Sequence, residues 1–203
     1  MPEERESERI CLFGGTFDPV HIAHLKIANE ALKRFTLSRV LFVPSAIPPH
    51  KDASAVTPYE DRYRMLEIAC APYPCFIASR LEAGSETNYT IDTLDRFRPS
   101  LKPEDQLFFL IGADAFDEIK TWKRWQDVIT QIEFIAVSRP GRTYDVPEGA
   151  RVHPLDGLEL PVSSSTIRAR LVAGEQVAEV PAEVREYIEQ RGLYGTAKAT
   201  ASL

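Results

Sequence analysis

The sequence has no long apolar run, no regular cysteine pattern and no excess of positive charge. No stretch approaches the roughly 20 apolar residues that span a bilayer, and the charged start, Met1–Arg9, lacks the apolar segment of a signal peptide. We therefore expect no membrane association and a cytoplasmic location. The 3 cysteines are irregularly spaced and fit neither a disulfide framework nor a zinc site.

The formal net charge of −6 argues against an extended nucleic-acid surface, which usually carries a basic excess. It does not exclude a small anionic substrate, because a few cationic groups can focus on one cleft of an acidic protein. The 203 residues suffice for a single domain with a substantial core. We expect that core at about 9–194, with 1–8 and 195–203 as flexible tails.

Apolar segments with strand and helix patterns alternate along the chain. Strands are predicted at Ile10–Gly14, Arg39–Pro44, Cys75–Arg80, Gln106–Ile111 and Glu133–Ser138. Helices are predicted at His21–Phe35, Thr57–Cys70, Thr90–Phe97, Trp125–Gln131, Ser163–Ala173 and Pro181–Gln190, the second of them with a capping box from Thr57. This alternation predicts an α/β, Rossmann-like fold: a mostly parallel sheet of five or six strands with helices on both faces. Ligands of such sheets bind beyond the carboxyl ends of the strands.

The segment Gly14–His24 follows the first predicted strand and opens the first predicted helix. Gly14 and Gly15 allow close approach of the backbone to a ligand, although glycines after a strand also make ordinary tight turns. His21 and His24 are three residues apart and share a helix face near an N-terminus, where anions are favoured. No further His, Cys or acidic motif accompanies them, so we assign no metal site to the protein.

A second polar segment, Val162–Arg168, begins the helix that follows the last strand-like segment. Ser163 is a natural helix cap, which is the simplest interpretation of this segment. Ser164 and Arg168 are four residues apart, however, so that a hydroxyl, free N–H groups and a guanidinium point the same way. Because Arg is suited to bidentate phosphate contact, this helix start is also a candidate phosphate site.

The first segment, G-G-T-F-D-P-V-H-I-A-H, resembles the G-G-x-F-D-P-x-H-x-G-H signature of the nucleotidyltransferase superfamily. The second, V-S-S-S-T-I-R, resembles the I-S-S-T-x-I-R motif, and N-Y-T-I-D-T-L (residues 88–94) resembles x-Y-T-x-D-T-L. From Ile10 to Tyr194 the chain resembles the bacterial nicotinate-nucleotide adenylyltransferases. Ala23 stands where that family has glycine, and Ser165 replaces a threonine.

The resemblance implies transfer of AMP from ATP to nicotinate mononucleotide, with release of pyrophosphate, in NAD biosynthesis. The ATP-binding residues it implies are Gly14, Gly15, Thr16, Phe17, His21, His24, Gly112, Asp114, Ser163, Ser164 and Arg168. The mononucleotide-binding residues are Lys51, Tyr89, Thr90 and Trp122, and His21, His24, Lys51 and Arg168 are the expected catalytic set. Mg²⁺ is expected to arrive with ATP.

Two details of this expectation rest on position. Tyr89 and Thr90 lie at a predicted helix start, so their N–H groups are candidates to receive the nicotinate carboxylate. Trp122 lies between Lys120-Thr121 and Lys123-Arg124, which favours a partly exposed ring, and the resemblance implies that it stacks on the pyridine.

Alternatives remain open at this stage. The acceptor is nicotinamide mononucleotide or pantetheine phosphate in other members of the superfamily. A class I aminoacyl-tRNA synthetase relative shares the H-x-x-H helix motif, and a non-catalytic nucleotide-binding relative is the third alternative. The sequence does not define the oligomeric state, and a homo-oligomer is one of the states that it leaves open.

Overall fold

The computed structural model describes residues 6–47, 56–84, 89–138, 144–158 and 161–196. Its strands are β1 (Arg9–Gly15), β2 (Arg39–Pro44), β3 (Phe76–Ala78), β4 (Gln106–Gly112), β5 (Glu133–Val137) and β6 (Arg151–Leu155). Its α-helices are α1 (Ile22–Arg34), α2 (Tyr59–Cys70), α3 (Thr90–Phe97), α4 (Ala113–Asp117), α5 (Trp125–Gln131), α6 (Ser164–Val172) and α7 (Ala182–Arg191). The short 3₁₀ turn η4 (Leu193–Gly195) follows α7.

The strands form one parallel sheet in the order β3-β2-β1-β4-β5-β6. The chain thus builds one half of the sheet outward from β1 and then returns to add β4 on its other side. This is the doubly wound order, which confirms the predicted α/β, Rossmann-like class. Phe13 pairs with Phe42 on one side and with Leu110 on the other, so the carboxyl ends of β1, β2 and β4 lie at a common edge.

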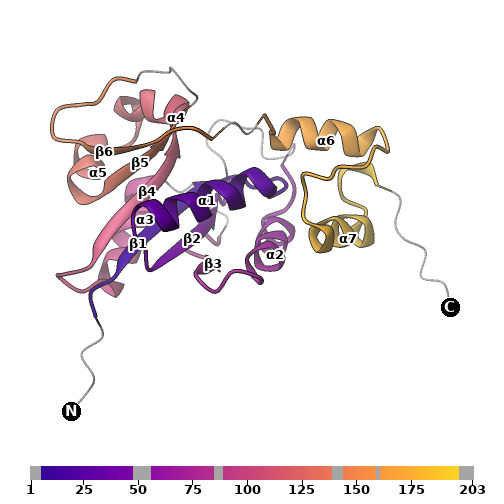
Figure 1. The fold of residues 1–203 in the computed structure, drawn as a ribbon, viewed down its shortest axis with the longest axis horizontal. Helices are drawn as coiled ribbons and strands as arrows, with labels where there is room; N and C mark the ends of the chain where they lie inside the picture. The colour runs from indigo at the N-terminus through magenta and orange to yellow at the C-terminus, as the bar shows by residue number, and fades with distance from the viewer. Residues whose placement is uncertain (1–5, 48–55, 85–88, 139–143, 159–160, 197–203) are drawn as a thin grey trace, which may run out of the picture.

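Each face of the sheet carries its own hydrophobic core, because successive strand side chains point to opposite faces. On one face Cys11, Phe13 and Phe42 pack with α1, α2, α6 and α7. On the other, Leu12 and Phe109 pack with α3, α4 and α5. Figure 1 shows α1 running along the sheet, with α6 and α7 beside α2 at one end. Helices on both faces are therefore confirmed.

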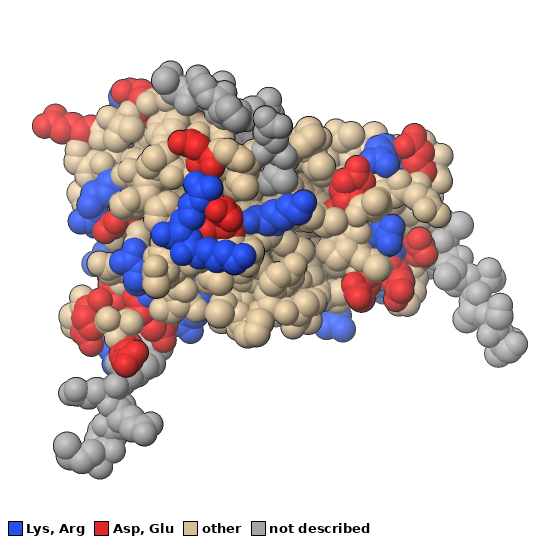
Figure 2. Space-filling model, viewed as in Figure 1, with Lys and Arg blue, Asp and Glu red and all other residues tan. Residues whose placement is uncertain are grey.

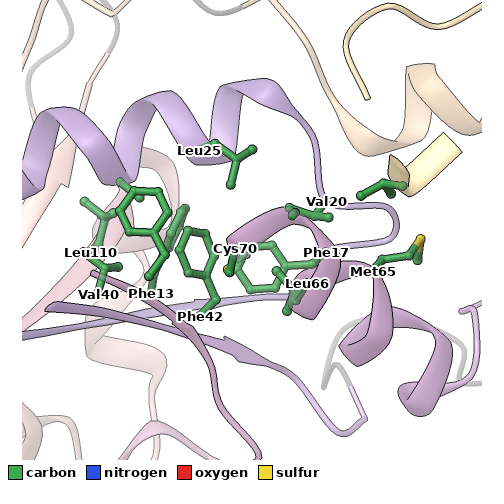
Figure 3. Packing of buried hydrophobic residues seen from close by; sticks show 14 of the residues in the cluster. Phe13, Phe17, Val20, Leu25, Val40, Phe42, Met65, Leu66, Cys70 and Leu110 are labelled. Atoms are coloured by element: carbon green, nitrogen blue, oxygen red, sulfur yellow. The ribbon is translucent and has the colours of Figure 1, made fainter. Parts of the chain in front are cut away.

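Phe13, Phe17 and Phe42 form an aromatic cluster beneath the start of α1 (Figure 3). Phe17 is 2% exposed, and its ring lies 5.4 Å from that of Phe13 and 5.8 Å from that of Phe42. Leu25 of α1 points toward this cluster. The loop after β1 is thereby anchored in the core by Phe17, although it runs across the ligand edge of the sheet.

The sequence missed two elements, β6 and α4. β6 reads Arg-Val-His-Pro-Leu, which lacks an apolar run because it is an edge strand, where proline is tolerated. α4 has only five residues and directly continues β4. The predicted capping box at Thr57 is wrong: α2 begins at Tyr59 with Pro58 as its cap and no side-chain cap bond. The Thr57 N–H instead donates to Asp18 Oδ2 at 3.4 Å.

No helix in the described part of the chain combines the length and apolarity that crossing a bilayer demands. On the face shown in Figure 2, basic and acidic side chains are interspersed and form no continuous basic surface.

Candidate active site

Two cavities adjoin at the carboxyl ends of β1 and β4, where the strand order reverses. The first, of about 270 Å³, is lined by His24, Asp114 and the apolar side chains of Ile27, Val137 and Leu158, among others. The second, of about 420 Å³, is lined by the end of β1 with its two glycines, by the start of α3 and by Trp122. Phe13, Ile111 and Gly112 line both cavities. The site thus offers two compartments with a shared wall.

Gly112 has open space on its exposed side: nothing lies within 4 Å of where a Cβ would stand. Gly14 and Gly15 differ from it. A Cβ on Gly14 would lie 3.2 Å from the Phe109 ring, and one on Gly15 would lie 3.0 Å from the Phe17 ring. A side chain on either of these two glycines, which end β1 and line the second cavity, would therefore press on an aromatic ring.

The imidazoles of His21 and His24 stack with their ring centroids 3.7 Å apart. The predicted helix included His21, but in the structure His21 is the N-cap residue that precedes α1 and has an extended conformation. Its backbone N–H donates to His24 Nδ1 at 3.2 Å. Because Nδ1 accepts this bond, the proton of a neutral His24 resides on Nε2. His24, which lines the first cavity, is thereby prepared to donate Nε2–H to an oxygen bound there.

Burial keeps both imidazoles neutral at pH 7. It lowers the pKa of His21 from 6.5 to about 4, with Glu179 partly opposing the effect. Burial also lowers the pKa of His24 well below 6.5, and a charge on His21 would lower it further. The pair therefore adds no fixed positive charge to the cleft, and His24 is a neutral hydrogen-bond donor.

The first turn of α1 is also less open to anions than the sequence predicted. The Ile22 N–H donates to the Glu179 carbonyl at 2.8 Å, and the His24 N–H donates to the His21 carbonyl at 2.9 Å. These amides are already satisfied within the chain, so side chains rather than this helix terminus carry the polar character of the first cavity.

The second motif lies directly against the first. Ser163 caps α6 by accepting a bond from the Thr166 N–H at 3.2 Å. Ser164 Oγ donates to the Pro19 carbonyl at 3.0 Å, and Arg168 Nη1 donates to the Asp18 carbonyl at 2.7 Å. Two segments about 145 residues apart in sequence are thus hydrogen-bonded through the loop that leads into His21.

Asp18 is a central residue of this junction that the sequence did not single out. It is 2% exposed. Its Oδ1 accepts a bond from the Tyr194 hydroxyl at 2.7 Å, and its Oδ2 lies 3.8 Å from Arg168 Nη1. The carboxylate joins the first loop to α6 and to η4 near the end of the described chain. No local pattern reveals this role, because Tyr194 lies 176 residues away.

The start of α3 faces the second cavity through Tyr89 and Thr90. The Tyr89 N–H, predicted to receive a substrate carboxylate, instead donates to Asp92 Oδ2 at 3.3 Å. Asp92 also pairs with Lys123 Nζ at 3.1 Å, and that ammonium group lies 4.8 Å from the centre of the Tyr89 ring. The Tyr89 N–H is thus already partnered within the helix start, and both Tyr89 and Thr90 line the second cavity.

The remaining predicted residues are distributed as follows. Trp122 lines the second cavity and contacts Phe109 edge-on, with ring centroids 6.0 Å apart. Asp114 lines the first cavity from the first turn of α4. The Phe17 side chain is buried and packs against His24, with ring centroids 5.0 Å apart. Lys51 lies outside the described residues.

Ala23, the departure from the family signature, is 5% exposed and is not among the residues that line either cavity. Its methyl group therefore does not narrow the two compartments.

Among the described residues, no group of three or more His, Cys, Asp and Glu side chains is arranged to hold a metal ion. The polar side chains that line the two cavities include the imidazole of His24, hydroxyls and the carboxylates of Asp114, Glu82 and Glu118.

A fold with this strand order and a paired-imidazole loop at its switch point defines a nucleotide-binding α/β transferase, and the comparisons agree. The cytidylyltransferase-like family model matches residues 12–170, and the chain belongs to this family.

Within that family, the similar curated proteins are named probable nicotinate-nucleotide adenylyltransferase. One from Solibacter usitatus is 50% identical, covering 92% of this chain and 99% of its own. One from Thermus thermophilus is 46% identical with the same coverage. The structure of Plasmodium falciparum nicotinic acid mononucleotide adenylyltransferase complexed with NaAD has a TM-score of 0.77. It is 21% identical and covers 94% of this chain and 98% of its own.

Proposed function

We propose that this protein transfers the adenylyl group of ATP to the phosphate of nicotinate mononucleotide, forming nicotinate adenine dinucleotide and pyrophosphate. The relatives that align over nearly their whole length carry the name of this activity. The observation that supports it best is the pair of adjoining cavities that meet at Phe13 and Gly112, with His24 in one and Trp122 in the other. A dinucleotide product needs two such compartments, joined where its bridging phosphates form.

We assign the adenosine to the first cavity and the mononucleotide to the second. Ile27, Val137 and Leu158 provide an apolar surface for adenine, and Asp114 provides a carboxylate for ribose hydroxyls. In the second cavity Trp122 provides a ring face for pyridine, and the Thr90 N–H is the candidate donor to the nicotinate carboxylate.

The reaction forms a bond between a phosphate oxygen of the mononucleotide and the α-phosphorus of ATP, while the bond from that phosphorus to the pyrophosphate oxygen breaks. The nucleophile is largely ionised near neutral pH, since the second pKa of a phosphate monoester is about 6. No general base is required. The protein has to hold two polyanions in line and stabilise the charge that develops on pyrophosphate.

His24 Nε2–H is assigned as a donor to an ATP phosphate oxygen in the first cavity. The His21 ring stacks on a face of the His24 ring. Arg168 is held by the Asp18 carbonyl through one Nη and is 30% exposed at its side chain, so it is assigned to the pyrophosphate end of ATP. Lys51 is assigned to the phosphates by its motif alone. We expect a divalent ion, Mg²⁺, to enter as the ATP complex and to be held mainly by the phosphates.

The test is pyrophosphate release by the purified protein with ATP and one acceptor at a time: nicotinate mononucleotide, nicotinamide mononucleotide or pantetheine phosphate. We expect rapid release with nicotinate mononucleotide and a clear preference over nicotinamide mononucleotide. Equal use of both pyridine nucleotides would refute the carboxylate contact at Thr90. Release with pantetheine phosphate alone would refute the proposed acceptor, and no release with any acceptor would refute the function.

A further inference from the structure

Arg62 of α2 is a fully buried arginine whose guanidinium is bound by backbone carbonyls. Its exposed fraction is 1%. Nε donates to the Thr57 carbonyl at 2.8 Å, and Nη1 donates to the Thr16 carbonyl at 2.9 Å. Nη2 donates to the carbonyls of Ser45 and Ala46 at 2.8 and 3.2 Å. One side chain therefore joins three separate stretches of backbone.

Two of these stretches line the mononucleotide cavity. Thr16 belongs to the loop after β1, and Ser45 follows β2; both residues line the second cavity. The Ser45 N–H also donates to the Gly15 carbonyl at 2.9 Å, so the two loops contact each other directly. Thr57 lies two residues before the start of α2. Arg62 thus binds the backbone both after β2 and before α2.

Only a guanidinium can make this set of contacts. It presents five N–H donors in a rigid planar fork, whereas a lysine ammonium has three donors around one point. Loop carbonyls at strand ends have no ladder partner, and leaving them unpaired in the interior would be costly. Burial lowers the pKa of Arg62, while Asp18 and, more weakly, Glu82 favour its charged form.

We propose that Arg62 is a positioning residue for adenylyl transfer. Through the carbonyls of Thr16, Ser45 and Thr57 it fixes the spacing of the loops that hold the mononucleotide, and thereby the line of attack on ATP. The proposal rests on the function proposed above. It predicts that the fork geometry matters for catalysis, beyond the contribution of Arg62 to folding.

The test compares Arg62→Lys, which keeps the charge but loses the fork, with Arg62→Met, which loses both. Met65→Ala, a fully buried substitution on the same helix, is the control for lost stability, and Arg80→Gln, on an exposed arginine, is the control for lost charge. The kinetic constants are measured at a temperature where circular dichroism shows each variant folded, with the acceptor that the wild type uses.

We expect Arg62→Lys to raise KM for the mononucleotide and to lower kcat, each by about tenfold or more, because ~1 Å misplacement of a reactant can slow a reaction about 100-fold. Both controls should stay within about twofold of the wild type, because neither side chain donates to the loop carbonyls that Arg62 binds. If Arg62→Lys behaves like Met65→Ala, Arg62 is merely structural. If Arg62→Lys equals the wild type while Arg62→Met does not, charge rather than geometry is responsible, and the proposal is wrong.

A measurement on the wild type covers the case in which Arg62 variants do not fold. In protein labelled with ¹⁵N-arginine, the Arg62 Nε–H should exchange slowly with solvent and should shift when the mononucleotide is added. An unchanged resonance at saturation would overturn the proposal. Turnover by the wild type tests the proposed function separately, since it does not depend on any Arg62 variant.

Discussion

Lowering the pH from 8 to 5 should destabilise the protein through His21. This ring is 4% exposed, and its burial lowers its pKa from 6.5 to about 4. In the unfolded chain the ring is exposed to water and regains the ordinary value. Between pH 4 and 6.5 the unfolded state therefore binds more protons than the folded state, so stability is lost as the pH falls through this window.

The size of the effect follows from the two pKa values. With 6.5 in the unfolded state and about 4 in the folded state, linkage gives a loss of about 2 kcal/mol at pH 5 and about 3 kcal/mol at pH 4. Above about pH 7.5 His21 is neutral in both the folded and the unfolded state, so its effect on the folding free energy vanishes. The pKa of His24 is lowered in the same direction, so its loss adds to that of His21. A loss of this size is a large fraction of a typical folding free energy of about 5–15 kcal/mol.

The assay is urea unfolding of the wild type and His21→Asn at pH 8, 7, 6 and 5. Asparagine is chosen because it also caps helices well. Carboxylates titrate in the same range in both proteins, so the difference between the two profiles reports on His21 together with its effect on His24. We expect the wild type to lose about 2 kcal/mol more than the variant between pH 8 and 5. Parallel profiles would show that His21 is not held neutral by burial.

Three further predictions concern single contacts. Tyr194→Phe should lower stability by about 2 kcal/mol in urea unfolding at pH 7, because it removes the hydroxyl bonded to the buried Asp18 carboxylate; an unchanged midpoint would contradict this. His24→Ala should reduce kcat about 100-fold, the usual cost of losing one preorganised donor, while retaining most of the stability; near-normal turnover would remove His24 from the mechanism. Trp122→Ala should raise KM for the mononucleotide about tenfold or more, as stacking on an aromatic ring contributes about 1–3 kcal/mol, and should leave KM for ATP nearly unchanged; equal changes in both would argue against stacking.

Local sequence patterns predict most of the helices and strands of the fold. α3 and α5 were predicted with their observed bounds, Thr90–Phe97 and Trp125–Gln131, because clear apolar periodicity and a following Pro or strand delimit them. β6 was not placed, since three of its residues, Arg151, His153 and Pro154, are atypical of a strand interior. An edge strand has only one neighbour, so its pairing is set by the sheet rather than by its own composition.

The site was predictable to the extent that its residues lie in contiguous motifs. His21, His24, Gly112 and Trp122 could be named from short segments. The roles of Asp18 and Arg62 could not, because each depends on partners far along the chain: Asp18 on Tyr194, and Arg62 on Thr16, 46 residues away. The neutral state of the imidazoles cannot be predicted from the sequence for a similar reason, because it depends on burial that only the assembled fold creates.

The bonds from α6 and η4 to Asp18 have a consequence for biosynthesis. A nascent chain that has emerged from the ribosome only as far as β6 already contains every strand of the described sheet and both imidazoles. It still lacks Arg168 and Tyr194, so the Asp18 carboxylate has neither its guanidinium neighbour nor its hydroxyl donor. Translation must therefore proceed through η4 before the Asp18 carboxylate in the loop that leads to His21 can gain these two neighbours.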